Sequence, residues 1–212
     1  MDEQTKKKKE IRPPRKISKS YLQNAGLYYL ERYPASVAHF KTVMQRKIDR
    51  SIRYHGTPSR EECAEWLDGV ADKYVEYGYL NDQRYAEGLI HSLQQKGRAE
   101  MKIRARLKQA GIDEHVIVSL MARKKEEEAE RLNDLPIPSN WPQQSSNISE
   151  YLAALKYAKK RRVGPYAALA RTPKDPEKAL AMLARNGFSY DIAQVILQTD
   201  ADEAEVFLLH SR

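Results

Sequence analysis

Apolar residues recur along most of this chain at the three- and four-residue spacing of amphipathic helices. The clearest case is the segment 36–55, where Phe40, Met44, Ile48 and Ile52 follow one another in steps of four. The same periodicity predicts helices over residues 18–32, 59–76, 82–96, 98–110, 113–121, 149–163, 177–185 and 190–198. Long β-branched runs are absent and glycine is scarce, which favours helix over sheet. The pattern therefore predicts an all-α protein with no strands.

One short motif occurs three times, and each copy ends on a glycine. The motif is lysine, an apolar residue, three residues, a second apolar residue, three residues and glycine; the copies are 47–56, 102–111 and 178–187. Gly56 and Gly111 are 55 residues apart, Gly111 and Gly187 are 76 apart, and a 21-residue insertion accounts for the difference. Chance is the alternative, because many helices stop on glycine. Three copies in register predict three tandem repeats of three helices each.

The chain divides around these repeats. We expect a disordered basic tail at 1–16, repeats at 17–80, 81–133 and 148–200, and a C-terminal tail at 201–212. A charge run at 123–131 is followed by Pro136, Pro138 and Pro142 in polar sequence, which indicates a linker or exposed insertion at 134–147. This insertion is either a hinge for the third repeat or a surface loop without a role.

Composition narrows the functional classes. The 212 residues carry a formal net charge of +8. The basic tail holds part of this charge, and it either touches nucleic-acid phosphates or only keeps the chain in solution. The single cysteine, Cys63, excludes a disulfide framework and a cysteine-rich zinc site. The sequence has no apolar run of membrane-spanning length and no secretion signal, so we expect a cytoplasmic protein and no membrane partner.

No catalytic constellation is visible. The five histidines form no HExxH arrangement and no recognisable pair with Cys63, which lies on the apolar face of its helix. The glycines follow helices rather than strands, so none belongs to a phosphate-binding loop. We therefore expect a protein that is not an enzyme and that uses no cofactor and no metal.

The segment 98–110 combines a narrow apolar stripe with a basic surface. At about 100° per residue, Ala99, Ile103, Leu107 and Ala110 fall within about 80°. The candidate binding residues lie around this stripe, on the preceding helix and in the third repeat: Arg84, Lys96, Arg98, Lys102, Arg104, Arg106, Lys108, Lys159, Lys160, Arg161 and Arg162, with Lys156 as an extension. Such a surface binds phosphates, binds an acidic protein, or is simply solvated.

Two stretches carry a family resemblance. The first reads Gly78-Tyr-Leu-Asn-Asp82-x-Arg84-Tyr-Ala86, then Lys96-Gly97, then Ile103-x3-Leu107-x3-Gly111-Ile-Asp113. The second reads Arg185-Asn-Gly187-Phe-Ser-Tyr190. The first resembles the signature core of the RecX family of recombinase regulators, and the second resembles that family's end motif. Tyr85 and Asn186 stand where the family more often has phenylalanine and arginine.

The resemblance implies a fold and a partner. The fold is three tandem three-helix repeats in an elongated, curved body. The function is binding of the RecA recombinase filament on DNA, with inhibition of its ATPase, strand-exchange and coprotease activities in recombination, DNA repair and the SOS response. We expect a monomer. The alternatives are a protein that acts directly on DNA through its basic face and tail, and a helical scaffold for an unrelated partner.

Overall fold

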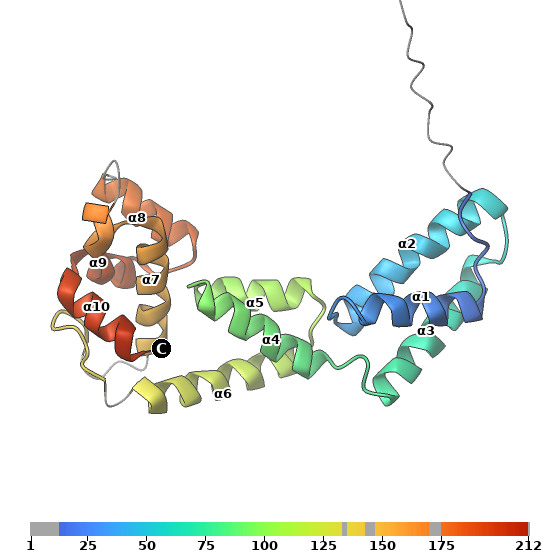
Figure 1. Ribbon diagram of the computed structural model, residues 1–212, viewed down its shortest axis with the longest axis horizontal. Coiled ribbons are helices and arrows are strands. Elements are labelled where there is room, and N and C mark those ends of the chain that lie inside the picture. The colour runs from blue at the N-terminus through green and yellow to red at the C-terminus, as the bar shows by residue number, and fades with distance from the viewer. Residues whose placement is uncertain (1–12, 133–134, 143–146, 170–174, 212) are drawn as a thin grey trace, which may run out of the picture. The chain divides into compact units, whose positions relative to one another are not determined.

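Every regular element in the described part of the chain is helical. The computed structural model describes residues 13–132, 135–142, 147–169 and 175–211, and these residues contain helices and no strand, which confirms the all-α class (Figure 1). The chain separates into two compact units, Met1–Asn81 and Asp82–Arg212. Of the predicted basic tail, residues 1–12 lie outside the described residues.

The first unit is a three-helix repeat. Its helices are α1 (Lys19–Leu30), α2 (Val37–His55) and α3 (Arg60–Glu76). A serine side chain accepts a hydrogen bond from a first-turn amide at each start, which satisfies a donor that the helix itself leaves open; these serines are Ser18, Ser36 and Ser59. Phe40, Met44 and Ile48 of the predicted α2 stripe are buried and Ile52 is partly buried, and Cys63 is fully buried among its neighbours, as expected of a core residue.

The second unit begins with another three-helix repeat. Its helices are α4 (Asp82–Gln95), α5 (Glu100–Gln109) and α6 (Glu114–Leu132). Helix α6 continues through the charge run at 123–131, well beyond the predicted helix end at residue 121. Lysine, arginine and glutamate are good helix formers, and pairs three or four residues apart support the helix, as between Arg123 and Glu127 at 3.4 Å.

Helix α7 forms the centre of the second unit. The remaining elements are α7 (Ile148–Arg161), the 3₁₀ turn η1 (Gly164–Leu169), α8 (Pro176–Arg185), α9 (Tyr190–Gln198) and α10 (Ala201–His210). Every residue from Tyr151 to Leu155 is buried, as expected for a helix with neighbours on all sides. Helix α7 packs against α4 and α6 on one hand and α8, α9 and α10 on the other. The second and third repeats therefore share one compact unit (Figure 1).

Two expectations about the third repeat are wrong. The predicted C-terminal tail contains α10, which the Asp200 side chain caps and which buries Phe207 completely. The predicted exposed insertion contains Trp141, which is only 3% exposed and donates its indole N–H to Thr199 Oγ1 at 2.9 Å. Both segments are held because aromatic side chains enter the third repeat's core.

The three motif glycines occupy equivalent places. Gly56 is the C-cap of α2, and Gly111 and Gly187 directly follow the C-cap residues of α5 and α8. All three have positive φ values, 71°, 77° and 101°, which glycine adopts without steric cost. The apolar residues eight positions before them are buried: Ile48, Ile103 and Ala179. Each glycine thus ends the second helix of its repeat.

Candidate partner-binding surface

Helix α5 buries one narrow stripe and presents cations around it, as the sequence predicts. The buried stripe consists of Ala99, Ile103, Leu107 and Ala110. The cations are the exposed Arg98, Lys102, Arg106 and Lys108 and the half-buried Arg104. The helix is short, and this stripe is its apolar contact with the rest of the second unit.

Carboxylates neutralise part of this basic face. Arg104 Nε lies 2.8 Å from Glu100 Oε1 within the helix, and Lys108 Nζ lies 2.9 Å from Glu114 Oε2 at the start of α6. Exposed pairs of this kind contribute little stability and can be exchanged for another anion. The Lys102 side chain has no ion-pair or hydrogen-bond partner within the described ranges.

The two other arginines of this set donate to amide groups. Arg106 Nη1 donates to Gln109 Oε1 at 2.9 Å on the exposed surface. Arg98 Nη1 donates to Asn186 Oδ1 at 2.8 Å, and Asn186 Nδ2 donates to the Gly97 carbonyl at 3.2 Å. Asn186 is 4% exposed, so this residue ties the end of α8 to the α4–α5 turn. Arg98 therefore has a structural contact in addition to its charge.

A basic hollow of about 540 Å³ lies beside α7. It is lined by Gln95, Lys96, Arg131, Lys156, Lys159, Lys160, Leu208 and Ser211. We call it the lysine hollow. Five of these residues are cations, and none of the described lining residues is acidic. They come from the end of α4 and the residue after it, from the end of α6, from α7, and from α10 and the residue after it. The second and third repeats therefore build the hollow together.

Two glutamates form ion pairs with cations of the lysine hollow. Lys159 Nζ lies 2.7 Å from Glu205 Oε1 on α10, and Arg131 Nη2 lies 3.9 Å from Glu128 Oε1. Burial lowers the pKa of Lys156 below its ordinary value, and Glu128 opposes that shift. An incoming anion would offset the cost of holding this ammonium group out of water.

The structure brings together three of the predicted binding residues, Lys96, Lys159 and Lys160, with Lys156 beside them. Arg131 joins this group although it is not among the residues predicted from the sequence. Its only signal was membership of the charge run, and it reaches the hollow because α6 extends to Leu132. The remaining predicted residues do not line the hollow: Arg84, Arg161, Arg162 and the five cations around α5.

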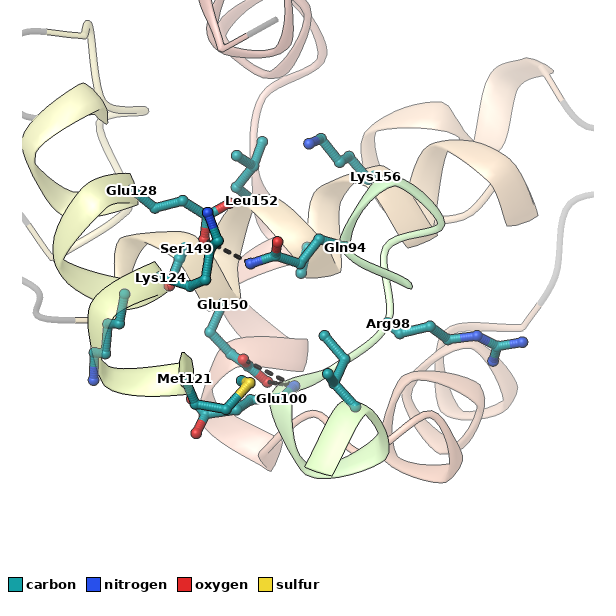
Figure 2. Close-up of a pocket in the computed structure, with 13 residues that line it drawn as sticks. Gln94, Arg98, Glu100, Met121, Lys124, Glu128, Ser149, Glu150, Leu152 and Lys156 are labelled. Carbon is teal, nitrogen blue, oxygen red and sulfur yellow. Dashed lines mark hydrogen bonds between the residues drawn. The ribbon is translucent and has the colours of Figure 1, made fainter. Parts of the chain in front are cut away.

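A polar seam joins the second and third repeats beneath this surface (Figure 2). Ala99 cannot cap α5 with its side chain, and the Glu150 carboxylate of α7 instead accepts the Glu100 amide at 3.3 and 3.4 Å. Gln94 Nε2 donates to Glu128 Oε2 at 3.3 Å. Figure 2 marks these contacts with dashed lines around a cavity of about 30 Å³, room for little more than a water molecule.

Burial raises the pKa of both seam carboxyls above the ordinary value. For Glu150, the Glu100 amide opposes this shift; for Glu128, the charges of Arg131, Lys156 and Lys124 oppose it. Desolvation is the largest cause in each case. The seam is therefore a packed structural contact that fixes α5 and α7 against each other.

Two further features are absent from the described residues. Nowhere in them do three or more histidine, cysteine, aspartate or glutamate side chains gather in a way that could hold a metal ion. No helix within the same ranges combines the length and the apolar character needed to cross a membrane.

Comparison with known proteins identifies the family. A regulatory protein RecX of Myxococcus xanthus is 36% identical over 197 residues, which cover 92% of this chain and 94% of that protein. The chain belongs to the RecX family. The family model for the second three-helix domain of RecX matches residues 81–119, which span α4, α5 and the start of α6.

Further RecX proteins agree with this assignment. A regulatory protein RecX of Agrobacterium fabrum is 24% identical over 191 residues, covering 89% of this chain and 88% of that protein. The crystal structure of RecX from Lactobacillus salivarius shares the fold, with a TM-score of 0.52 and 19% identity over 85% of this chain and 94% of that one. The resemblance stated from the residues around Gly78–Asp113 is thus confirmed.

Proposed function

We propose that this RecX family member is a non-enzymatic regulator that binds the RecA filament on DNA. Binding would lower the ATPase, strand-exchange and coprotease activities of RecA in recombination, DNA repair and the SOS response. The lysine hollow is the observation that supports this proposal most strongly. A RecA–DNA filament carries phosphates, and five cations fixed on one compact unit provide a matching positive surface.

The geometry favours binding by a prepared surface. Lys96 follows α4, and Lys160 lies near the end of α7, so two repeats must be docked for these cations to share one hollow. The seam below keeps them docked before any partner arrives. A preformed surface loses little side-chain and backbone freedom on binding, which favours affinity.

The test reverses charges in the lysine hollow of the full chain. Lys96 and Lys160 are both exposed, and neither has an ion-pair partner within the described residues. The variant Lys96→Glu with Lys160→Glu should need at least about tenfold more protein to inhibit RecA ATPase on single-stranded DNA, a change of about 1.4 kcal/mol. The control reverses two exposed lysines outside the hollow, Lys73→Glu with Lys178→Glu, and should inhibit like the parent chain.

Unchanged inhibition by the hollow variant, with normal helical content by circular dichroism, would remove the lysine hollow from the proposed interface.

A second charge reversal tests α5. Arg98 and Arg104 have internal partners, so reversing them would change structure as well as charge. Lys102→Glu is the cleaner substitution, and we expect it to weaken inhibition without lowering the melting temperature.

The second candidate is a protein that acts directly on DNA, because the same hollow could hold bare phosphates. The two functions differ in their dependence on RecA. At about 150 mM salt, contacts to phosphates alone weaken steeply, so the regulator should bind RecA-coated DNA more tightly than naked DNA. Equal affinity for both would favour direct DNA binding.

A further inference from the structure

A second basic hollow, of about 520 Å³, lies in the first unit. The proposed function does not use this surface. The hollow is lined by Pro14, Arg15, Tyr21, Lys47, Arg50, Arg53 and Tyr54. We call it the arginine hollow. Four of these residues are cations, two are tyrosines, and none of the described lining residues is acidic.

The cations of the arginine hollow are not neutralised locally. None of the four forms an ion pair or a side-chain hydrogen bond with another described residue. Elsewhere on α2, Lys41 Nζ lies 2.8 Å from Asp68 Oδ1, so this helix does pair its cations where a carboxylate is near. An unpaired cluster of like charges raises the energy of the unit unless an anion binds.

Two hydrogen bonds hold the segment before α1 against α2 and so complete the hollow. His55 Nε2 donates to the Pro14 carbonyl at 2.7 Å. The Ile17 amide donates to Ser51 Oγ at 2.9 Å, and both residues of that pair are buried. Arg15 lies between these two anchors, so its backbone is fixed beside the cations of α2.

The cations of α2 form a row. Lys47 and Arg50 are three residues apart, as are Arg50 and Arg53, and Tyr54 is four residues beyond Arg50. Residues at these spacings are neighbours on a helix surface, and the row from Lys47 to Tyr54 extends about 10 Å along the axis. A row of this length fits successive phosphates of a chain better than it fits one small anion.

An aromatic ring lies at the end of that row. The Tyr54 side chain is 63% exposed, and its ring meets the His55 ring edge-on with centroids 4.8 Å apart. Exposed aromatic rings beside a basic groove are the usual platform for unstacked bases, because every base has a face that can stack. In a duplex the bases are already stacked, so this ring favours a single strand.

We propose that the arginine hollow binds single-stranded DNA, with Arg15, Lys47, Arg50 and Arg53 on the phosphates and one base stacked on Tyr54. The first unit then holds a nucleic-acid site of its own. Binding there requires no RecA and no residue of the lysine hollow. Its failure and a failure of the proposed function can therefore be told apart.

Fluorescence anisotropy with a labelled 20-nucleotide oligo(dT) and the full chain tests the site. Arg50→Glu with Arg53→Glu should weaken binding at least about tenfold, and the loss of two phosphate contacts should reduce the salt slope, d log K/d log[salt], by about 1.4 in magnitude. The control, Arg46→Glu with Lys73→Glu, makes the same charge change on exposed residues outside the hollow. We expect it to lower affinity by less than about twofold.

Tyr54 supplies a test that leaves charge unchanged. Tyr54→Ala should lose about tenfold in affinity for the single strand, whereas Tyr54→Phe retains the ring and should bind normally. Because the side chain is exposed, both variants should fold. Equal binding by the alanine and phenylalanine variants, or equal effects of the hollow and control charge reversals, would overturn the proposal. So would full loss of binding on changing only Lys6 to Lys9 to glutamine.

Discussion

The α4–α5 turn offers a sharp test of how the second unit is built. Gly97 has φ of +63°, and a Cβ placed there would lie 2.7 Å from the Tyr157 amide nitrogen and 2.8 Å from the Ala153 carbonyl oxygen. Both atoms belong to the backbone of α7, which cannot rotate aside as a side chain can. Gly97→Ala should therefore force the turn and α7 apart.

The expected loss has two parts. An alanine in the left-handed region costs about 1–2 kcal/mol, and overpacking a tight contact costs about 1–3 kcal/mol. Together they predict that Gly97→Ala lowers the unfolding free energy of the second unit by about 2–5 kcal/mol. Gly56 is the matched control: its φ is +71°, and a Cβ there would have no neighbour within 4 Å. Gly56→Ala should therefore show only the cost of placing alanine in the left-handed region, about 1–2 kcal/mol.

Urea unfolding followed by tryptophan fluorescence can measure the two units separately. The chain has two tryptophans: Trp66 lies in α3 of the first unit, and Trp141 is buried in the second. Gly97→Ala is measured in a Trp66→Phe background and Gly56→Ala in a Trp141→Phe background, each against its own parent. If the two losses agree within about 0.5 kcal/mol, the contact between the turn and α7 contributes nothing and the reasoning is refuted.

Three further predictions concern the seam and the insertion. Glu150→Ala removes the acceptor for the Glu100 amide and should cost the second unit about 1 kcal/mol in urea unfolding, whereas Glu150→Gln retains an acceptor and should cost less. Burial raises the folded-state pKa of Glu128 and Glu150 above 4.5, so their contribution to stability is complete below that pH and is lost as pH rises through the folded values. The unfolding free energy of the double variant Glu128→Gln with Glu150→Gln should therefore rise relative to that of the parent chain between pH 4 and pH 7. A difference that does not change with pH would contradict the raised pKa values of the two glutamates. Trp141→Ala should cost about 3–5 kcal/mol, measured by thermal unfolding, because a free linker would not bury this ring or bond it to Thr199; an unchanged melting temperature would restore the linker interpretation.

Sequence periodicity predicted the helices because each has a local cause. The spacing of the apolar residues in α2 and the glycine that follows α5 each determine structure only within a few residues along the chain. The sequence pattern therefore indicates them directly. The same holds for Cys63, whose place on an apolar face indicated a core residue. The positive charges can also be identified from the sequence, which predicts Lys96, Lys159 and Lys160 as binding residues. The sequence does not show that these three lysines line one hollow.

The interpretation from sequence failed where distant contacts decide the structure. Trp141 stands among prolines and polar residues, and only the core of the third repeat explains its burial. Helix α10 was read as a tail because its apolar residues face a core that Phe207 helps to form. The cap that Glu150 supplies to α5 joins residues 50 positions apart, and no local motif encodes it. Arg131 was missed because the helix that carries it was expected to end earlier.

The three repeats use one block in different ways. The residue pattern that ends in glycine packs its apolar positions against the core in each repeat, so it specifies the fold and little else. The outward residues differ. On α2, Arg50 and Arg53 have no carboxylate partner, whereas on α5, Arg104 and Lys108 are paired with glutamates. In the third repeat, the lysines that line a hollow come from the first helix, α7. We therefore expect the proposed binding surfaces to depend on the outward charges of each repeat, because the shared apolar stripe leaves the outward positions unconstrained.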